Sequence, residues 1–409
     1  MQIYVRIRKN NCCGERMAMQ NYSEQKKHID NIIGEELPEI TALSDYLADN
    51  PEESGQEYET SRKIVDLLNG KGFSTEYPFA GLKTAFKASC GPDNHKYKVA
   101  VLAEYDALPG IGHACGHNVS GAISILAGLA LKDLQDHLDA DIHIIGTPAE
   151  ESDGAKCIMC DQGVFREYDM AMMVHLYDQN QTYCTLNGLA SFMYDFRGKA
   201  SHAGAAPWEG QNALNAAQLM LHGIDCIRGC SRPETRLNSV IFKGGAAGGS
   251  IPEDAQLETW IRFPEYSYLE KLMKRVDNCA AGAALMAECT WEKYPTAAVY
   301  KSMKRNPAGE EAIAEVFGEL GLELNGNPDA LFGSSDIGNV SFECPSFHPT
   351  LQLVDKGIPI HTREFLSGVK GERAHKAIED GAKLIAYTVA KIFGDEENIK
   401  KMKAEFAGN

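Results

Sequence analysis

Three apolar runs of strand length end at side chains that can bind a metal ion or carry a proton. They occupy residues 97–106, 141–147 and 170–174, and segments with helical patterns separate them. Strands joined by helical crossovers pair in parallel, so their carboxyl ends meet at one edge of a sheet. The pattern therefore predicts an α/β fold in which the residues after these three strands lie close together.

The flanking segments predict helices that cover the sheet and a second, smaller unit. Helical patterns run from about residue 23 to residue 68 and again over 371–393, with apolar positions on one face. Between them, alternating strand patterns and helical segments are typical of a small α+β unit. We predict a domain formed by residues 19–187 and 296–409, an inserted domain at 188–295, and a disordered extension at 1–18.

The loop after the first strand is rich in potential metal ligands. It carries His113, Cys115 and His117 within five residues. Asn118 is a residue type suited to the N-cap of the helix expected over 119–134, which places the ligands on a loop between a strand and a helix. The alternative interpretation of this loop is a pair of histidines beside a buried thiol, without a metal.

Two further strand ends carry side chains of the same chemistry. The second strand runs into Glu150 and Glu151, and His175 follows the third. Imidazole, thiolate and carboxylate together suit zinc and related ions, so Cys115, His117, Glu151 and His175 are predicted ligands. A set this rich allows two ions about 4 Å apart.

The adjacent glutamates need separate roles. Neighbouring side chains on an extended segment point in opposite directions, so Glu151 could bind metal while Glu150 faces the substrate as a general base. The alternative is a pair of carboxylates that caps the helix expected near residue 154.

Composition narrows the class of protein. The chain has 409 residues and a net charge of −17, which argues against nucleic acid or an anionic membrane as a partner. Twelve cysteines without a disulfide framework indicate a reduced, cytoplasmic protein. The sequence has no apolar run of membrane-spanning length, and residues 1–9 do not read as a signal peptide.

Cysteine chemistry offers two other interpretations. His117 could activate Cys115 as a nucleophile, but this leaves Glu150, Glu151 and His175 without a role. The Cys157-x-x-Cys160 spacing could indicate a redox or zinc motif, but it lies in an apolar helical context where the spacing marks one helix face.

Four motifs resemble a known family. They are EYDALPGIGHACGHN at 104–118, GTPAEE at 146–151, GKASHAGAAP at 198–207 and PIHTREF at 359–365. They resemble the metal-dependent amidohydrolase branch of the aminoacylase and carboxypeptidase superfamily, above all the aminobenzoyl-glutamate hydrolase and β-alanyl-lysine dipeptidase group. The resemblance implies a di-metal exopeptidase-like fold, with a mixed, largely parallel sheet sandwiched by helices and an inserted α+β lid and dimerisation domain.

The resemblance also assigns roles to residues of this sequence. It implies two divalent ions, of zinc or alternatively manganese, nickel or cobalt. It gives Glu150 as the base and Asp106 as a residue that holds a ligand in place. The implied ligands are Cys115, His117, Glu151, His175 and His361.

The inserted block is similar to the family's lid domain, which forms a homodimer in many members. His202 matches a histidine that assists the substrate carbonyl, often from the neighbouring subunit, and Arg262 matches an arginine that holds a substrate carboxylate. Gly249 stands where the family has an asparagine, which removes one expected substrate contact. His348 could face the same cleft, although a packed histidine beside proline fits the sequence better.

The resulting hypothesis is a hydrolase that cleaves the amide bond of a small N-acyl amino acid or dipeptide, of the aminobenzoyl-glutamate or β-alanyl dipeptide type, by a metal-activated water. One alternative is a deacylase that acts on other N-acyl conjugates with the same machinery. The other is a metal-binding scaffold protein without catalytic activity.

Overall fold

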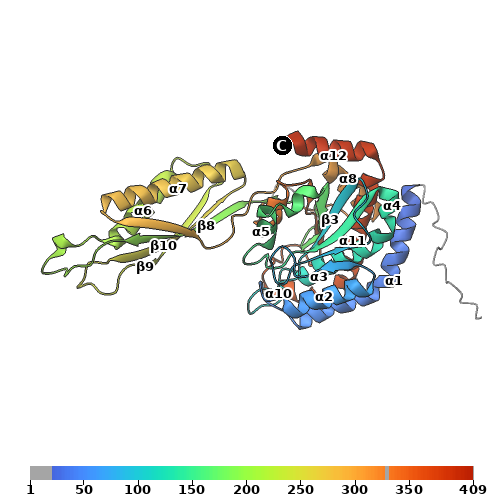
Figure 1. Cartoon of the computed structure of the whole chain (residues 1–409), viewed down its shortest axis with the longest axis horizontal. Coiled ribbons are helices and arrows are strands. Elements are labelled where there is room, and N and C mark those ends of the chain that lie inside the picture. Colours follow the sequence, from blue (N-terminus) through green and yellow to red (C-terminus); the bar gives the residue numbers. More distant parts are fainter. Residues whose placement is uncertain (1–20, 328–330, 409) are drawn as a thin grey trace, which may run out of the picture.

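The larger part of the molecule is built on a six-stranded sheet (Figure 1). A computed structural model describes residues 21–327 and 331–408, so the extension predicted at 1–18 lies outside the described residues. The central strands pair in parallel, and β1 and β2 add antiparallel at one edge. This mixed, largely parallel sheet confirms the predicted fold class. Its spatial order is β1 (Ser74–Glu76), β2 (Phe86–Ser89), β4 (Ala140–Gly146), β3 (Tyr97–Ala103), β5 (Met170–Met172) and β13 (Ser346–Phe347).

Helices cover both faces of this sheet because its central strands are apolar on both sides. Val99 and Val101 of β3 share a core with α1 (Tyr22–Asp49), α3 (His117–Leu131) and α11 (Glu372–Phe393). Ala100 and Leu102 point to the opposite face and pack with α5 (Ala155–Asp161) and α9 (Ile337–Val340). Burial on both faces explains why the strand reads as one continuous apolar run.

Shorter elements complete this part of the chain. They include two small parallel pairs of strands, β6 with β14 and β7 with β12. No helix within the described ranges is long and apolar enough to cross a membrane. The remaining bounds are α2 (Tyr58–Gly70), η1 (Lys132–Leu134), α4 (Gln135–Leu138), η2 (Val164–Glu167), β6 (His175–Tyr177), β7 (Thr185–Leu186), α8 (Pro307–Glu319), β12 (Leu331–Gly333), β14 (Thr350–Gln352), α10 (Arg363–Leu366) and α12 (Glu396–Gly408).

The prediction that Asn118 caps a helix is wrong. Helix α3 begins two residues earlier than expected, at His117, and its N-cap is Gly116, which makes no side-chain capping bond. Asn118 is buried instead, and its side-chain amide donates to the Ser44 and Val369 carbonyl oxygens. The amide therefore links α3 to two distant segments of the chain rather than starting a helix.

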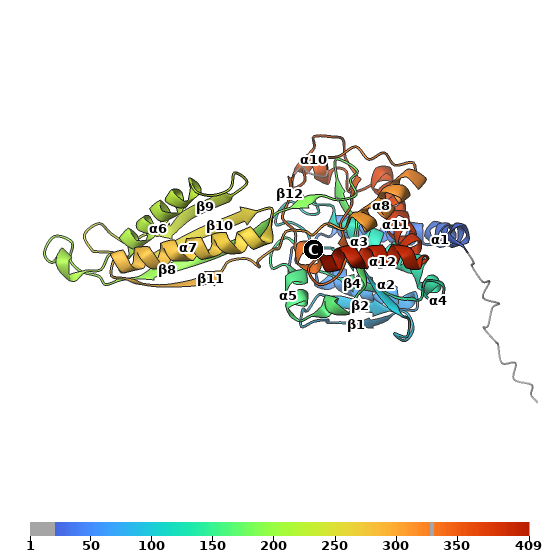
Figure 2. The ribbon, with the colours of Figure 1, turned by 90° about the horizontal axis from the view of Figure 1, so that it is seen from above.

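A second body extends away from the first and contains a four-stranded antiparallel sheet (Figures 1 and 2). The residues of β10 are alternately buried and half-buried, which fits a sheet with one face packed and one face open. The buried face packs against α6 and α7. The elements are β11 (Thr290–Pro295), β8 (Gly188–Arg197), β10 (Asp254–Phe263) and β9 (Arg236–Lys243) in sheet order, with α6 (Ala213–Arg228), α7 (Tyr266–Met286) and η3 (Pro207–Glu209).

The chain passes between the two bodies twice, and the two connecting segments are hydrogen-bonded to each other. The Leu189 N–H donates to the Tyr300 carbonyl and the Tyr300 N–H to the Leu189 carbonyl, both at 2.9 Å. The Thr296 N–H also donates to the Ser191 carbonyl at 3.0 Å. The junction is therefore a short paired ribbon rather than two independent linkers.

Candidate metal centre

The ends of neighbouring strands position most of the predicted site residues. Cys115 lies in the loop after β3, and His117 is the first residue of α3. Between them Gly116 has φ +86°, and a β-carbon there would lie 3.1 Å from the Leu176 side chain. Only glycine meets both requirements at low cost, so this turn brings the two candidate ligands together.

The potential ligand atoms converge in overlapping groups of three. Within each group these atoms all lie within 4.8 Å of one another. The structure therefore brings all five predicted ligands together, including His361, which is distant in sequence. The groups are Cys115, His117 and His175; Cys115, Glu151 and His361; and His117, Glu150 and Glu151.

The two glutamates lie on a tight turn, which differs from the predicted extended segment. Ala149 has φ +56°, and the Gly154 N–H closes the turn on the Ala149 carbonyl at 2.8 Å. Both carboxylates belong to one group with His117, and their other neighbours differ. Glu151 lies near Cys115 and His361, whereas Glu150 lies near a different pair of carboxylates. Helix α5 begins after Gly154 without a side-chain cap, so the capping alternative is wrong.

Hydrogen bonds orient two of the candidate imidazole ligands. The His117 Nδ1–H donates to Asp106 Oδ1 at 2.9 Å, and the His175 Nδ1–H donates to the Leu176 carbonyl at 2.8 Å. Each bond places the lone pair of a neutral ring on Nε2, and His175 Nε2 lies 3.5 Å from Cys115 Sγ. Such outer contacts are typical of histidines that bind metals.

The charges around these rings follow from burial and close contacts. Burial alone would raise the pKa of Asp106, but His117 and the Glu151 N–H outweigh it and lower that pKa to about 2. Burial lowers the pKa of His175 to about 4, so this imidazole is neutral at pH 7. A neutral imidazole, as in His175, is the form that metal binding requires.

Two buried atoms indicate that the group fits a cation. Among the described residues, His117 Nε2 and Glu151 Oε1 are buried without a hydrogen-bond partner. Unsatisfied buried polar atoms are costly, and a cation between them would remove that cost. His361 Nε2 approaches Glu151 Oε1 to 3.2 Å, as expected for two donors that face one ion. The donor set of thiol, imidazole and carboxylate suits zinc and its neighbours.

The environment of Cys115 argues against a cysteine nucleophile. Burial raises the pKa of its thiol well above the usual value, although His117 partly opposes the shift. Nucleophilic cysteines instead have a lowered pKa. Cys157 and Cys160 lie on α5 with their pKa values also raised by burial, which does not support a redox motif.

Two predicted substrate contacts lie on the second body, outside this cluster. His202 is exposed, and its Nδ1 accepts from the N–H groups of Gly204 and Ala205 at 3.2 and 3.1 Å. Arg262 is half-buried near the junction end of β10, next to the Trp260 ring. Its Nε is buried without a hydrogen-bond partner among the described residues. Gly249 lies beside the loop that carries His202, and its carbonyl accepts a hydrogen bond from the Ala203 N–H at 3.0 Å.

Sequence reasoning missed a buried ionic network beside Glu150. Lys156 is fully buried, and its Nζ donates to Glu104 Oε1 and Asp336 Oδ1, both at 2.6 Å. Carboxylate oxygens of Glu104, Glu150 and Asp336 lie within 4.8 Å of one another, so the ammonium offsets part of the charge of three clustered acids. The available signal was Lys156 itself, a charged residue near the start of an apolar helical run.

Other histidines near the centre have different surroundings. His348 is buried, its ring lies 5.3 Å from that of His175, and its Nδ1 is 3.4 Å from Cys184 Sγ. It is therefore packed, as the sequence indicates, yet it borders the centre. His113 is buried but belongs to none of the groups of converging ligand atoms.

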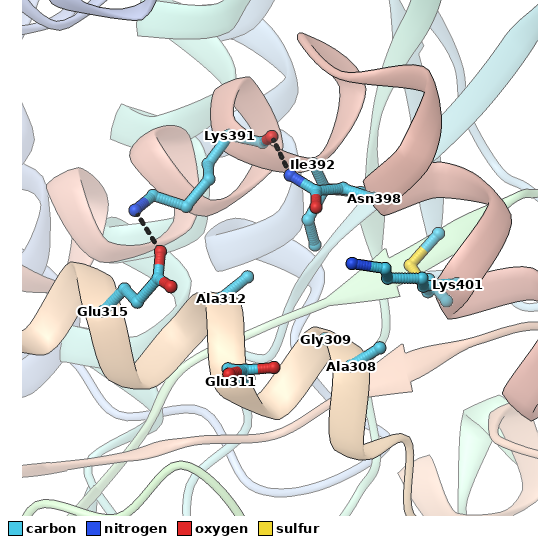
Figure 3. Close-up of a pocket in the computed structure, with 10 residues that line it drawn as sticks. Ala308, Gly309, Glu311, Ala312, Glu315, Lys391, Ile392, Asn398 and Lys401 are labelled. Carbon is cyan, nitrogen blue, oxygen red and sulfur yellow. Dashed lines mark hydrogen bonds and ion pairs between the residues drawn. The ribbon is translucent and has the colours of Figure 1, made fainter.

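A separate pocket of about 180 Å³ lies between α8, α11 and α12, away from these residues (Figure 3). In it the Lys391 ammonium pairs with Glu315 at 2.6 Å, and the Asn398 amide donates to the Lys391 carbonyl. None of its lining residues is a predicted site residue. The pocket therefore contributes nothing to the candidate metal centre.

Comparisons with known proteins identify the family of this chain. The family description "Peptidase family M20/M25/M40" matches residues 100–391. The Xaa-Arg dipeptidase of Mus musculus is 30% identical over 390 residues, which cover 91% of this chain and 90% of that protein. One of the two p-aminobenzoyl-glutamate hydrolase chains of Escherichia coli (strain K12) is 26% identical over 459 residues, covering 93% of this chain and 94% of that one.

A solved structure shares the fold. It is a Bacillus subtilis protein described as a dinuclear metal binding peptidase, with a TM-score of 0.66 at 19% identity over 86% of this chain and 97% of that one. The family match spans the strand ends, the turn with the two glutamates and the segment of His361. This chain therefore belongs to the M20/M25/M40 peptidase family and is a hydrolytic enzyme.

Proposed function

We propose that this enzyme cleaves the amide bond of a small N-acyl amino acid or dipeptide at the candidate metal centre. The observation that carries the proposal is the convergence of five potential metal ligands beside the buried carboxylate of Glu150. The named relatives are an Xaa-Arg dipeptidase and an aminobenzoyl-glutamate hydrolase, and both names describe cleavage of such a bond.

Two divalent cations would be held by Cys115, His117, Glu151, His175 and His361. When bound, they would supply Lewis acidity, which lowers the pKa of water and polarises an amide carbonyl. Cys115, His117 and Glu151 each belong to two of the ligand groups, so these three side chains link the positions that the cations would take. Asp106 holds the His117 ring with Nε2 facing the centre.

Glu150 would act as the proton carrier. Burial, together with the nearby charges of Glu104 and Glu151, raises the pKa of Glu150 well above its usual value. A carboxylate with a raised pKa can take a proton from the attacking water and later deliver it to the departing amine. Glu150 therefore serves both proton transfers, the one from water and the one to the amine.

The second body would supply the contacts that recognise the substrate. Every amino-acid or dipeptide substrate of this type carries a carboxylate, and the guanidinium of Arg262 can bind it with two hydrogen bonds. The buried Nε of Arg262 supports this role, because it lacks a protein partner among the described residues. His202 would stabilise the developing oxyanion, either after closure of its own lid or from a partner subunit.

Metal removal tests the proposal most directly. Protein of measured metal content should hydrolyse at least one member of a panel of dipeptides ending in arginine or lysine, aminobenzoyl-glutamate and N-acetyl amino acids. Chelation should lower that rate on the order of 100-fold or more, because the carbonyl and the water lose their activation. Zinc, manganese or cobalt should restore it. A metal-loaded protein that cleaves none of these substrates would refute the proposal.

A homodimer through the inserted domain is the proposed assembly. Strand β9 is the outer strand of its sheet, and Val240 and Phe242 on it are 50% and 62% exposed. An apolar edge strand favours pairing with a second copy. The double variant Val240→Lys/Phe242→Lys should sediment as a monomer, whereas the wild type should sediment as a dimer.

Tyr294 offers a matched control for the dimer. It lies on β11, the opposite edge of the same sheet, and is 45% exposed. Tyr294→Lys should leave the dimer intact, because it adds a charge of the same kind at an edge that is not paired. A monomeric wild type, or a dimer that survives both lysines on β9, would contradict this assembly.

A further inference from the structure

Side chains from three different segments hold the backbone of the turn that carries Glu150. The Ala149 N–H donates to Glu57 Oε1 at 2.9 Å, and the Glu151 N–H donates to Asp106 Oδ2 at 3.0 Å. The third contact is on Glu150 itself, whose carbonyl oxygen accepts from the Tyr300 hydroxyl at 2.8 Å. Each residue of 149–151 therefore has its own anchor.

These anchors matter because the turn is not a relaxed conformation. Ala149 has φ +56°, in the left-handed region that residues with a β-carbon adopt at an energetic cost. Surrounding contacts must offset this cost for the conformation to persist. Removing one anchor should let the backbone of Glu150 leave the position that places its carboxylate.

Tyr300 is the one of these anchors that belongs to the junction between the two bodies. Its backbone is paired in both directions with Leu189, at the start of β8. Its side chain leaves this ribbon and enters the first body, where it is 6% exposed. A β-carbon on Gly154, at the end of the turn, would lie only 2.7 Å from the Tyr300 ring. The ring thus packs against the turn while the hydroxyl binds it.

We propose that Tyr300 is a positioning residue that couples the orientation of the inserted domain to the placement of Glu150. This inference rests on the proposed function, in which Glu150 carries the proton. Any movement of the paired ribbon moves the Tyr300 backbone, and the buried ring transmits the movement to the turn. Closure of the inserted domain over a substrate would in this way bring Glu150 into position.

The variant Tyr300→Phe keeps the ring and removes only the hydroxyl. With the fastest substrate of the panel, kcat should fall about tenfold, the range expected for one lost hydrogen bond that orients a reacting group. KM should stay within about twofold and the metal content should not change, because no ligand or substrate contact is altered. A purely structural defect would lower metal content and the amount of folded protein together.

Tyr183→Phe is the matched control. The Tyr183 hydroxyl also donates to a backbone carbonyl, that of Met303, at 3.1 Å, and Tyr183 is also buried. This variant removes a bond of the same kind without touching the turn. Its kcat should equal that of the wild type.

Hydrogen exchange gives a second measurement that does not depend on turnover. The Glu151 N–H donates to the Asp106 side chain and the Gly154 N–H to the Ala149 carbonyl. Because both bonds depend on the conformation of the turn, Tyr300→Phe should speed their exchange about five- to tenfold. Adding arginine, lysine or glutamate, as the amino-acid product of the substrate, should change this exchange in the wild type through the inserted domain. The same addition should change it far less in Tyr300→Phe.

The outcomes separate this inference from the proposed function. If the wild type cleaves a substrate and Tyr300→Phe matches it in kcat and in exchange, the coupling is refuted and the hydrolase proposal stands. An equal response of both proteins to the amino acid would also refute the coupling. If the metal-loaded wild type cleaves nothing, the proposed function fails, and the exchange data still decide whether Tyr300 holds the turn.

Discussion

Replacing Glu150 with glutamine should leave the bound metal in place and lower kcat between about 10²- and 10⁴-fold, the range that a positioned general acid or base contributes. Glutamine has nearly the same shape, so the turn and its neighbours need not move. It cannot accept a proton from water or return one to the leaving amine. The loss should therefore appear in kcat, with little change in KM.

The surroundings of Glu150 also predict the stability of this variant. Its carboxylate lies within 4.8 Å of those of Glu104 and Asp336, and burial raises its pKa. An uncharged amide relieves repulsion in this cluster. The variant should unfold at the same temperature as the wild type or at a higher one, so inactivity cannot be ascribed to misfolding.

Glu151 provides the matched control for this experiment, because it has the same side chain on the same turn. Its carboxylate is grouped with Cys115 and His361, so Glu151→Gln should lose bound metal as well as activity. Metal analysis of the two variants distinguishes the roles. Full activity in Glu150→Gln, or equal metal loss in both variants, would reject the assignment of Glu150 as the base.

The placement of the site could largely be predicted from the order of strands. Apolar runs identify β3, β4 and β5, and parallel pairing brings their ends to one edge, where ligands bind in such sheets. His361 could not be found in this way, because a loop far along the chain brings it there. Its φ is +64°, and its N–H donates to the Ala114 carbonyl at 2.9 Å. Only the family motif gave a signal for that contact.

The errors arose where a tertiary contact overrode a local preference. Asn118 is a residue type that often caps helices, but its side-chain amide instead donates to carbonyl oxygens of two distant segments of the chain. The segment with Glu150 and Glu151 directly follows a strand, yet Ala149 turns into the left-handed region and ends the extended conformation. In both cases the residues that determine the conformation lie outside the local sequence pattern.

The carboxylates that bury Lys156 lie far from it in the sequence, so its local pattern does not identify them, and this ion pair gives the second large prediction. Its neighbours on α5 are apolar, so an isolated helix would turn this lysine to solvent. In the fold it is fully buried between Glu104 and Asp336. Burial would lower the pKa of Lys156, but these two carboxylates raise it above the usual value, so the ammonium stays charged.

Replacing Lys156 with methionine should destabilise the protein by about 3–5 kcal/mol, the cost of leaving buried charges without their partner. Methionine has a similar length, so the loss reflects charge rather than a cavity. The temperature of unfolding should fall on the order of 10 °C. As a control, Lys98→Met removes a half-buried surface lysine that pairs with Asp93 and Glu167, and it should cost about 1 kcal/mol or less.

A double variant distinguishes two causes of the lost stability: the missing attraction of the ammonium, and the buried carboxylates that it leaves without a partner. Lys156→Met/Asp336→Asn removes the ammonium together with one of its carboxylates, and it should recover part of the stability lost by Lys156→Met. Recovery follows because the cost of breaking a buried ion pair lies mainly in the charge that remains. If Lys156→Met unfolds like the wild type, or if the double variant adds the full cost of both changes, the ammonium does not hold this acid cluster together.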